Sequence, residues 1–321
     1  MRALGWFAFL LLLGPAITFA SAQAPPEWPE LELVHAYRLS WPGNFQPSGL
    51  TACQGKLLTV SDRHDLEIQE IRLGANGQAE VRPFGRFTEL PPPPPLATAV
   101  DVLRQMILTL VGKQYDWEGI TCDDQGSLYL ASEAYSAVLK IPTQGPLHWI
   151  TLAPHPEIQA RKLLGQANAG IEGVQWLPGN SLMIAAESNP AGLIRCRIDH
   201  GLCHPEQVRV LSDTQLPPDI QTRDISGVST AAQRLYVLER YHARVCRRDT
   251  KDFKIERCYS FKATEKHPRH AHRGAAWGQA EGLQVLEDRI FLVIDNNGRV
   301  LRSDPSSTDT WLFEFRRPDG F

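Results

Sequence analysis

Five copies of one short pattern divide this 321-residue chain at nearly regular intervals. In each copy a polar residue, a glycine and an aliphatic residue open a β-rich run, and a second β-rich run ends in a carboxylate 13 to 15 residues after the polar residue. The copies begin at Ser48, Glu118, Glu172, Ser226 and Glu281 and end at Asp62, Glu133, Glu187, Glu239 and Asp295. Successive starts lie 70, 54, 54 and 55 residues apart, which is typical of a repeat architecture.

Each copy carries enough β-rich segments for one blade of a β-propeller. Third and fourth candidate strands follow the two runs of the pattern, and in the last unit they fall at residues 299–302 and 311–315. Four strands in each of five units predict an all-β fold, a five-bladed β-propeller of four-stranded antiparallel blades. An extra segment at residues 31–39 is expected to pair with the last blade and remove the exposed sheet edges. The alternative is a sixth, degenerate blade.

The first interval is about 16 residues longer than the others and contains a helical insertion at about residues 91–114. Residues 91–95 are all proline, and the apolar stretch that follows at 96–111 carries only two charges, Asp101 and Arg104. This pattern predicts a helix after a stiff polyproline spacer. Its role is open: a cover over one blade, a lid over one face, or a membrane-contacting element. A second, short exposed helix is expected at residues 156–167.

The N-terminus carries the features of an export signal. Arg2 precedes an apolar run at residues 6–13, and small residues at 20–22 have the spacing that a signal peptidase needs. We therefore expect a signal peptide at residues 1–22, a single propeller domain at residues 23–321, and a periplasmic or secreted location. An uncleaved membrane anchor is the alternative, but the apolar run is shorter than the roughly 20 residues of a span.

Six cysteines, an even number in a chain expected to be exported, suggest disulfides. Two pairs flank short turn-like segments and would each staple a local hairpin, whereas a third pair lies at nearly equivalent points of consecutive units and would link adjacent blades. Buried free thiols are the alternative. The expected pairs are Cys53–Cys122, Cys196–Cys203 and Cys246–Cys258.

Charge and motifs exclude several function classes. The net charge of −3 and a pI of about 6.4 come without a basic block, so nucleic acid is not an expected partner. The chain has neither the Gly-x-Ser-x-Gly motif of a serine hydrolase nor a His-Glu-x-x-His zinc motif. The expected partner is a small-molecule or protein ligand on the acidic face of the propeller. The oligomeric state is left open.

The repeat predicts that its acidic residues gather at one end of the molecule. In an antiparallel hairpin the first residue of one strand and the last residue of its partner share an edge, and radial repetition brings all copies around one axis. Crowded carboxylates raise each other's pKa unless a cation balances them. Oxygen ligands outside the cytoplasm favour calcium. The alternative is a hydrated funnel, and the motif glycine indicates either close backbone approach at the axis or a bulge at a blade corner.

A histidine-rich stretch precedes the fifth copy and is expected to overhang the acidic face. His267, His270 and His272 are the candidate catalytic residues, because a histidine beside a cation-bound water can act as general base. Nearby arginines would hold an anionic substrate. His64 and His242 are second candidates. The alternative is a solvated loop without a catalytic role.

Short segments of the chain resemble two related propeller families, the phytase-like group (esterase-like activity of phytase) and the SdiA-regulated family. The resemblance spans about residues 31–316 but depends on short motifs, so it is specific for fold and not for activity. The matching segments are YDWEGI at 115–120, NAGIEGV at 168–174, LYVLER at 235–240, QAEGL at 279–283 and IDNN at 294–297.

The resemblance to the SdiA-regulated family implies a five-bladed propeller with calcium at a shared site, which Glu118, Glu172 and Glu281 contact, with Asp295 or Asn296 nearby. The phytase-like resemblance implies hydrolysis of phosphoesters or carboxyl esters. Serine replaces glutamate in the first and fourth copies, which breaks the symmetry of the ring. The expected function is an exported calcium-binding propeller that hydrolyses an ester, lactone or phosphoester with its metal. The alternative is a non-enzymatic propeller that binds a ligand or protein and uses calcium structurally.

Overall fold

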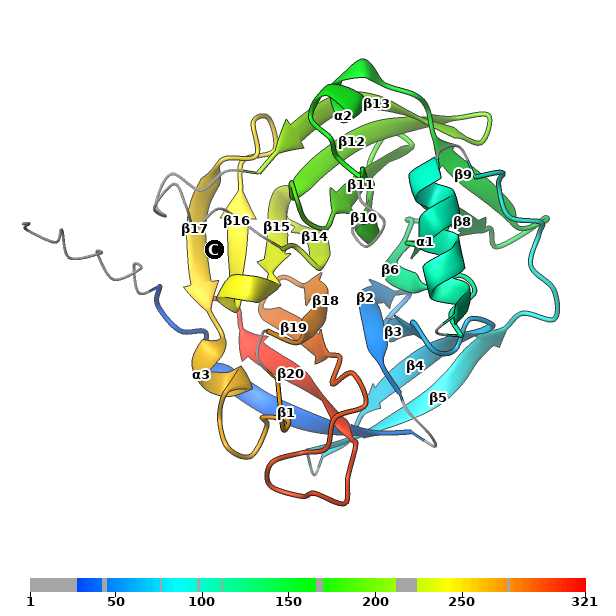
Figure 1. Ribbon diagram of the computed structural model, residues 1–321. Coiled ribbons are helices and arrows are strands. Elements are labelled where there is room, and N and C mark those ends of the chain that lie inside the picture. Colours follow the sequence, from blue (N-terminus) through cyan, green and yellow to red (C-terminus); the bar gives the residue numbers. More distant parts are fainter. Residues whose placement is uncertain are drawn as a thin grey trace, which may run out of the picture.

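Figure 1 shows a computed structural model of the chain, in which short strands are arranged around a common centre. The structure describes residues 28–41, 45–75, 77–96, 99–110, 112–165, 170–211, 224–275 and 278–321. These residues form 20 strands, three α-helices and one short 3₁₀ helix. The fold is all-β and propeller-like. The signal peptide expected at residues 1–22 lies outside the described residues.

The described strands form two eight-stranded sheets and one four-stranded sheet. The first sheet has the spatial order β18 (Ala280–Val285), β19 (Arg289–Ile294), β20 (Thr310–Arg316), β1 (Leu33–Ser40), β5 (Gln78–Arg86), β4 (Glu67–Leu73), β3 (Lys56–Ser61) and β2 (Pro47–Cys53). The second has the order β10 (Ile171–Leu177), β11 (Ser181–Ala186), β12 (Gly192–Asp199), β13 (Leu202–Val210), β9 (His148–Leu152), β8 (Ala137–Ile141), β7 (Leu128–Ser132) and β6 (Trp117–Cys122). The third consists of β14 (Gly227–Ala231), β15 (Arg234–Glu239), β16 (Arg244–Arg248) and β17 (Ile255–Ser260).

The eight-stranded sheets arise because outer strands of neighbouring four-strand units pair with each other. β1 pairs in parallel with β5 over three residue pairs, and β13 pairs in parallel with β9 over two. The hairpins within the units are antiparallel. The prediction of five separate four-stranded sheets is therefore not met, because pairing at the rim merges neighbouring units.

The N-terminal strand completes the last unit, as the sequence predicts. β1 pairs antiparallel with β20, in a register that runs from Leu33 opposite Phe315 to Leu39 opposite Thr310. The predicted strand at residues 299–302 is wrong, since this segment makes only an isolated bridge and lies in the loop between β19 and β20. β20 therefore takes the third position of the unit, and β1 takes the fourth.

The second strand of each unit is deeply buried because its neighbours cover both of its faces. All five residues of β7 and all six of β11 are buried. Such strands read as near-continuous apolar runs, which is how the sequence reveals them. Val60 of β3, Trp117 of β6 and Leu130 of β7 share one fully buried cluster. The core thus lies between neighbouring units and fixes where the inner strands end.

Glycines of the innermost strands let the units approach each other closely around the axis. A Cβ placed on Gly49 would lie 2.5 Å from the backbone nitrogen of Ile120, and one on Gly282 would lie 2.6 Å from the carbonyl oxygen of Ser48. Only about 10 Å³ of space remains on the axis at this level. Close backbone approach, the first of the two explanations for the motif glycine, is confirmed at these positions.

The predicted insertion carries the helix α1 (Ala99–Leu110), which Figure 1 shows beside β6 and β8. The helix turns its charge inward, since Arg104 is fully buried and donates a hydrogen bond of 3.4 Å to the carbonyl oxygen of Leu164. Met106 and Leu110 are 60% and 86% exposed. The apolar side of α1 therefore faces outward, the reverse of an ordinary surface helix.

The other helical segments are short. α2 (Pro156–Ala160) ends earlier than the helix expected at residues 156–167, because turns follow it. The 3₁₀ helix η1 (Arg240–His242) directly follows β15, and α3 (Lys262–Glu265) comes shortly after β17. Within the described ranges, no helix combines the length and the apolar character that crossing a membrane requires.

All three expected disulfides are present. Cys53–Cys122 joins β2 to β6 and so links consecutive units across 69 residues. The other two staple single hairpins. Cys196–Cys203 joins β12 to β13, and Cys246–Cys258 joins β16 to β17.

Candidate functional site

The three motif glutamates each occupy a β-bulge at the inner end of a strand. The register of β6 against β7 shifts between Trp117 and Gly119, so Glu118 is an extra residue without a partner. The same shift leaves Glu172 unpaired in β10 and Glu281 unpaired in β18. A bulge re-aims the side chain that it carries. In these three copies the polar-Gly-aliphatic pattern therefore marks both a bulge and a close backbone approach.

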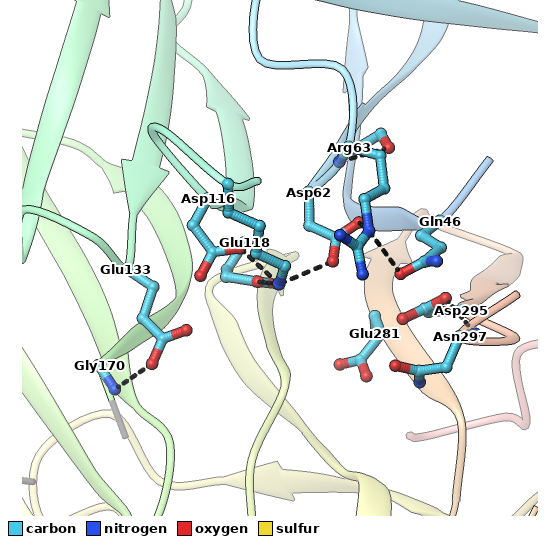
Figure 2. A network of polar contacts seen from close by, with 12 residues as sticks. Gln46, Asp62, Arg63, Asp116, Glu118, Glu133, Gly170, Glu281, Asp295 and Asn297 are labelled. Atoms are coloured by element: carbon cyan, nitrogen blue, oxygen red, sulfur yellow. Dashed lines mark hydrogen bonds and ion pairs between the residues drawn. The ribbon is translucent and has the colours of Figure 1, made fainter. Parts of the chain in front are cut away.

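One group of three carboxylates lies where the first and second units meet, and Figure 2 shows the three side chains turned toward one another. Asp62, Asp116 and Glu118 each place an oxygen within 4.8 Å of the other two. The Nζ of Lys113 lies 2.8 Å from Oδ2 of Asp62, 2.7 Å from Oδ1 of Asp116 and 3.9 Å from Oε1 of Glu118. Burial disfavours the ammonium, but the three carboxylates outweigh it and raise the pKa of Lys113. One side-chain cation thus lies among the three carboxylates and partly offsets their charge, while burial still raises the pKa of Asp62 and keeps that of Glu118 well above its usual range.

A second group joins the second and third units. Glu133, Glu172 and Glu187 also place oxygens within 4.8 Å of one another. Glu133 accepts a hydrogen bond of 3.1 Å from the backbone N–H of Gly170 (Figure 2), and Glu187 accepts one of 3.1 Å from Arg240. Within the described part of the chain, Glu172 makes neither a hydrogen bond nor an ion pair, although it is only 6% exposed.

The acids of this second group hold their protons unusually tightly. Burial, with the charge of Asp116 added, raises the pKa of Glu133 to about 8. Burial and the charge of Asp224 raise the pKa of Glu187 to about 7 against the opposing effect of Arg240. Burial and neighbouring acids raise the pKa of Glu172 well above its usual range. The group therefore lacks the positive charge that would ionise all three.

The third group has Arg240 at its centre. Its guanidinium donates to Asp224 at 2.8 Å, to Glu187 at 3.1 Å, and to Glu281. Burial raises the pKa of Glu281 to about 8, since the effect of burial is larger than the opposing effect of the Arg240 charge. One guanidinium here serves three carboxylates.

Glu239 differs from the other carboxylates that end a second strand. It forms ion pairs with Arg244 and Arg248, and all three side chains are fully buried. Burial opposes its ionisation, but the two guanidinium groups outweigh burial and lower the pKa of Glu239. It is therefore a structural ion-pair partner.

Asp295 and Asn296 follow β19 at the same end. Asp295 accepts a hydrogen bond of 2.7 Å from the backbone N–H of Asn297 (Figure 2), and burial together with the charge of Asp62 raises its pKa to about 7. Asn296 uses both ends of its amide inside the loop, where Oδ1 accepts from the N–H of Gly298 at 2.9 Å and the amide nitrogen donates to backbone carbonyls. The five expected metal ligands are thus distributed over different local environments.

The candidate histidines are held by local contacts. His272 is buried, with Nδ1 3.2 Å from Oε1 of Gln279 and Nε2 3.0 Å from the carbonyl oxygen of Asp309. His270 places Nδ1 2.9 Å from the carbonyl oxygen of Thr264. Burial lowers the pKa of both rings. Both nitrogens of His272 therefore lie within hydrogen-bond distance of a protein oxygen, and the neutral ring donates its one N–H to one of the two.

His267 is exposed, and its ring lies 5.2 Å from that of His270. The rings of the second candidates, His64 and His242, lie against aromatic residues. No described hydrogen bond or ion pair joins His267, His270 or His272 to the three carboxylate groups. Their catalytic role stays a prediction.

A cavity of about 550 Å³ opens beside the Arg240 group. Charged and polar side chains of the third, fourth and fifth units contribute to its wall. They include Asp224, Arg240, Tyr241, Gln279, Glu281 and Arg299.

A family model described as SdiA-regulated matches residues 96–294, which is more than half of the chain. This chain belongs to the SdiA-regulated family. The match confirms the resemblance to that family, and the phytase-like name is not matched. No curated protein matches the chain.

Three solved structures are similar to this SdiA-regulated protein, and only the first of them has a TM-score above 0.5, so the fold comparison depends on that one alone. Glutaminyl cyclase from Myxococcus xanthus superposes with a TM-score of 0.56 at 12% identity and covers 91% of this chain and 100% of its own. The PQQ-bound aldose sugar dehydrogenase from Streptomyces coelicolor has a TM-score of 0.46 at 13% identity, with 92% and 100% covered. A streptogramin B lyase has a TM-score of 0.45 at 13% identity, with 88% and 87% covered. At such identities the likeness concerns the fold alone.

Among the described residues of this SdiA-regulated protein, one acidic group fits the calcium that the family resemblance implies. Glu133, Glu172 and Glu187 offer carboxylate oxygens, the ligands that calcium prefers, and Arg240 reaches only one of the three. Sequence reasoning missed Lys113 and Arg240. The available signal was position, since each lies within five residues of a repeat glutamate, at Glu118 and Glu239.

Proposed function

We propose that this protein is an exported propeller that binds a divalent cation, calcium being favoured, through Glu133, Glu172 and Glu187. One observation supports this assignment above the others: these three acids converge within 4.8 Å, and among the ion pairs of the described residues only Glu187 of the three has a basic partner, Arg240. The neighbouring group already holds the ammonium of Lys113 among its carboxylates. Three disulfides fit a periplasmic or secreted location.

The proposal includes a five-bladed architecture. Each eight-stranded sheet is read as two four-stranded blades that meet at their outer strands, and the four-stranded sheet is read as the fifth blade. In support, the parallel pairing between units covers only three and two residue pairs. With this division every described strand belongs to one of the five blades, so no described strand remains for a sixth.

The proposed activity is hydrolysis of an ester, lactone or phosphoester. A cavity of about 550 Å³ adjoins Glu281, whose pKa of about 8 suits a proton donor or acceptor near neutral pH. Arg240 and Arg299 in its wall can orient an anionic substrate. A bound divalent cation would supply Lewis-acid polarisation or an activated water.

The second candidate function is non-enzymatic binding of a small molecule or protein, with the cation in a structural role. The position of His272 favours it, because both ring nitrogens lie within hydrogen-bond distance of protein oxygens. Rates on p-nitrophenyl esters, lactones and phosphate monoesters, measured with calcium and with a chelator, distinguish the two. Rates equal to the uncatalysed background on all three classes would leave binding as the function.

Calcium titration of the purified protein by calorimetry tests the cation site. Glu172→Gln should lower calcium affinity at least tenfold and remove the rise in melting temperature that calcium gives, because one of three converging carboxylates loses its charge. Glu118→Gln is the matched control, because it makes the same substitution at the equivalent glutamate of the neighbouring group. It should change calcium affinity much less, since the ammonium of Lys113 already lies in that group. If Glu118→Gln were the more damaging change, the ligand set implied by the family resemblance would be favoured instead.

A further inference from the structure

The cavity beside Arg240 has a charge distribution that the cation site does not explain. Its volume of about 550 Å³ is in the range of small-molecule sites. Acidic side chains from the fourth and fifth units and an arginine from the loop after β19 share its wall. These are Asp224, Glu281 and Arg299.

The acidic part of the wall has an excess of hydrogen-bond acceptors. Arg240 contacts both Asp224 and Glu281, so two carboxylates share one guanidinium at the cavity. Oδ1 of Asp224 and Oε2 of Glu281 are buried and accept no hydrogen bond within the described ranges. Glu281 is only 7% exposed. A buried acceptor without a donor is destabilising, so this part of the wall suits a ligand with N–H donors and a positive charge.

The basic part of the wall has a guanidinium without an acidic partner. Arg299 lines the cavity and is half-buried, and its backbone N–H donates to the carbonyl oxygen of Asn296 at 2.9 Å. Its side chain forms no ion pair or hydrogen bond with the rest of the described chain, whereas Arg240 and Arg244 each pair with carboxylates. A free guanidinium at a cavity suits a carboxylate, which it can bind through two parallel hydrogen bonds.

We propose that this cavity binds a small zwitterion of the amino-acid and short-peptide class. Its ammonium group lies at the oxygens of Asp224 and Glu281, and its carboxylate lies at Arg299. A simple cation would leave Arg299 unused, and a simple anion would leave both acidic oxygens unpaired. The inference deepens the proposed function, since it names the ligand class of the acidic face, and it does not require the metal to take part.

Peptides that lack one of the two charged groups of the zwitterion test the inference. Binding of the twenty amino acids, Ala-Ala and tetra-alanine to the full chain is measured by calorimetry, together with N-acetyl-Ala-Ala and Ala-Ala amide. At least one free zwitterion should bind, and acetylating its amine or amidating its carboxylate should each weaken binding at least tenfold. If no member of the panel binds, or if neither modification matters, the inference is overturned.

Substitutions assign each pole to its residues. Arg299→Gln should abolish the difference between the free acid and the amide but keep the penalty for acetylation. Glu281→Gln should abolish the penalty for acetylation but keep the difference between the free acid and the amide. Asp224→Asn is a second variant at the ammonium-binding side and should behave in the same way. Arg273→Gln, at an exposed arginine outside the cavity wall, should leave binding unchanged. If Arg299→Gln and Arg273→Gln bind alike, the carboxylate assignment is wrong.

Calcium titration of the same samples separates the two proposals. Loss of zwitterion binding in a protein that still binds calcium overturns only the inference. Zwitterion binding in a protein that binds no calcium overturns only the cation site, and Glu172→Gln should lose calcium while retaining the zwitterion.

Discussion

The ammonium of Lys113 lies 2.8 Å from the carboxylate of Asp62 and connects the end of the helical insertion to the acidic end of the first unit. Lys113 is only 16% exposed and also contacts Asp116. An ammonium held among several carboxylates takes the place that a metal ion would otherwise fill. The insertion thus brings the ammonium of Lys113 into one of two similar acidic groups, and the proposed cation site is the other group.

Removing this ammonium should create a second cation site. In Lys113→Met the carboxylates of Asp62, Asp116 and Glu118 lose the ammonium that lies among them, which should destabilise the metal-free protein by roughly 3–5 kcal/mol at neutral pH. The calcium stoichiometry measured by calorimetry should rise from one to two. Lys251→Gln, at an exposed lysine, is the control and should change neither quantity. An unchanged calcium stoichiometry in Lys113→Met would contradict the view that the ammonium of Lys113 occupies the place of a metal ion.

The buried ion pairs of Glu239 should matter for stability and not for calcium. Glu239→Gln leaves the fully buried guanidinium groups of Arg244 and Arg248 without their counter-charge, so the free energy of unfolding should fall by roughly 3–5 kcal/mol. Calcium affinity should stay within twofold of the wild type. Urea denaturation measures the free energy of unfolding, and calorimetry measures the calcium affinity. A large loss of calcium affinity at full stability would show that Glu239 belongs to the cation site after all.

The disulfide between units should stabilise more than those within hairpins. Replacing Cys53 and Cys122 by alanine frees a loop of 69 residues, for which chain entropy predicts a loss of roughly 4 kcal/mol. Replacing Cys196 and Cys203 frees a loop of only seven and should cost distinctly less. Denaturant unfolding of both double variants under oxidising conditions makes the comparison. Equal losses would contradict the view that linking the first two units dominates.

The sequence predicts those parts of the structure that recur with the repeat. The periodic pattern locates the inner strands, and equivalent positions within it indicate the pairing of Cys53 with Cys122. The segment before the first repeat is correctly assigned to the last unit, because an unpaired edge strand needs a partner. Each of these inferences depends only on the repeated sequence pattern or on the need of the last unit for a further strand.

The charge arrangement could not be predicted in the same way, because it depends on which side chains meet across units. Arg240 serves acids from three units, and that contact depends on the angle between strands more than on their order. The same limit explains the error at residues 299–302, where an apolar Val-Leu pair resembles a strand but belongs to a loop. Rim pairing of β1 with β5 likewise has no sequence signal.

Stability of the metal-free protein should fall as pH rises from about 4.5 to 8. Glu133 and Glu281 have pKa values of about 8 in the folded state, and Glu187 and Asp295 have values of about 7, all above the usual range of an unfolded carboxyl. Across this window the folded chain keeps protons that the unfolded chain has released. The resulting stabilisation is complete below about pH 4.5 and is lost as pH approaches the folded-state values, on the order of 1 kcal/mol per retained proton per pH unit.

Calcium should reverse this trend, because the ion replaces the protons at Glu133 and Glu187. Its apparent affinity should therefore rise between pH 6 and pH 8, and the gain in unfolding free energy should be largest at the alkaline end. The lowered pKa of Glu239 acts below this window and leaves the sign unchanged. Denaturant unfolding at pH 5 to 9, with chelator and with calcium, measures both curves. A metal-free protein whose stability is flat or rises from pH 5 to 8 would contradict the raised carboxyl pKa values, and parallel curves would contradict a cation bound at these acids.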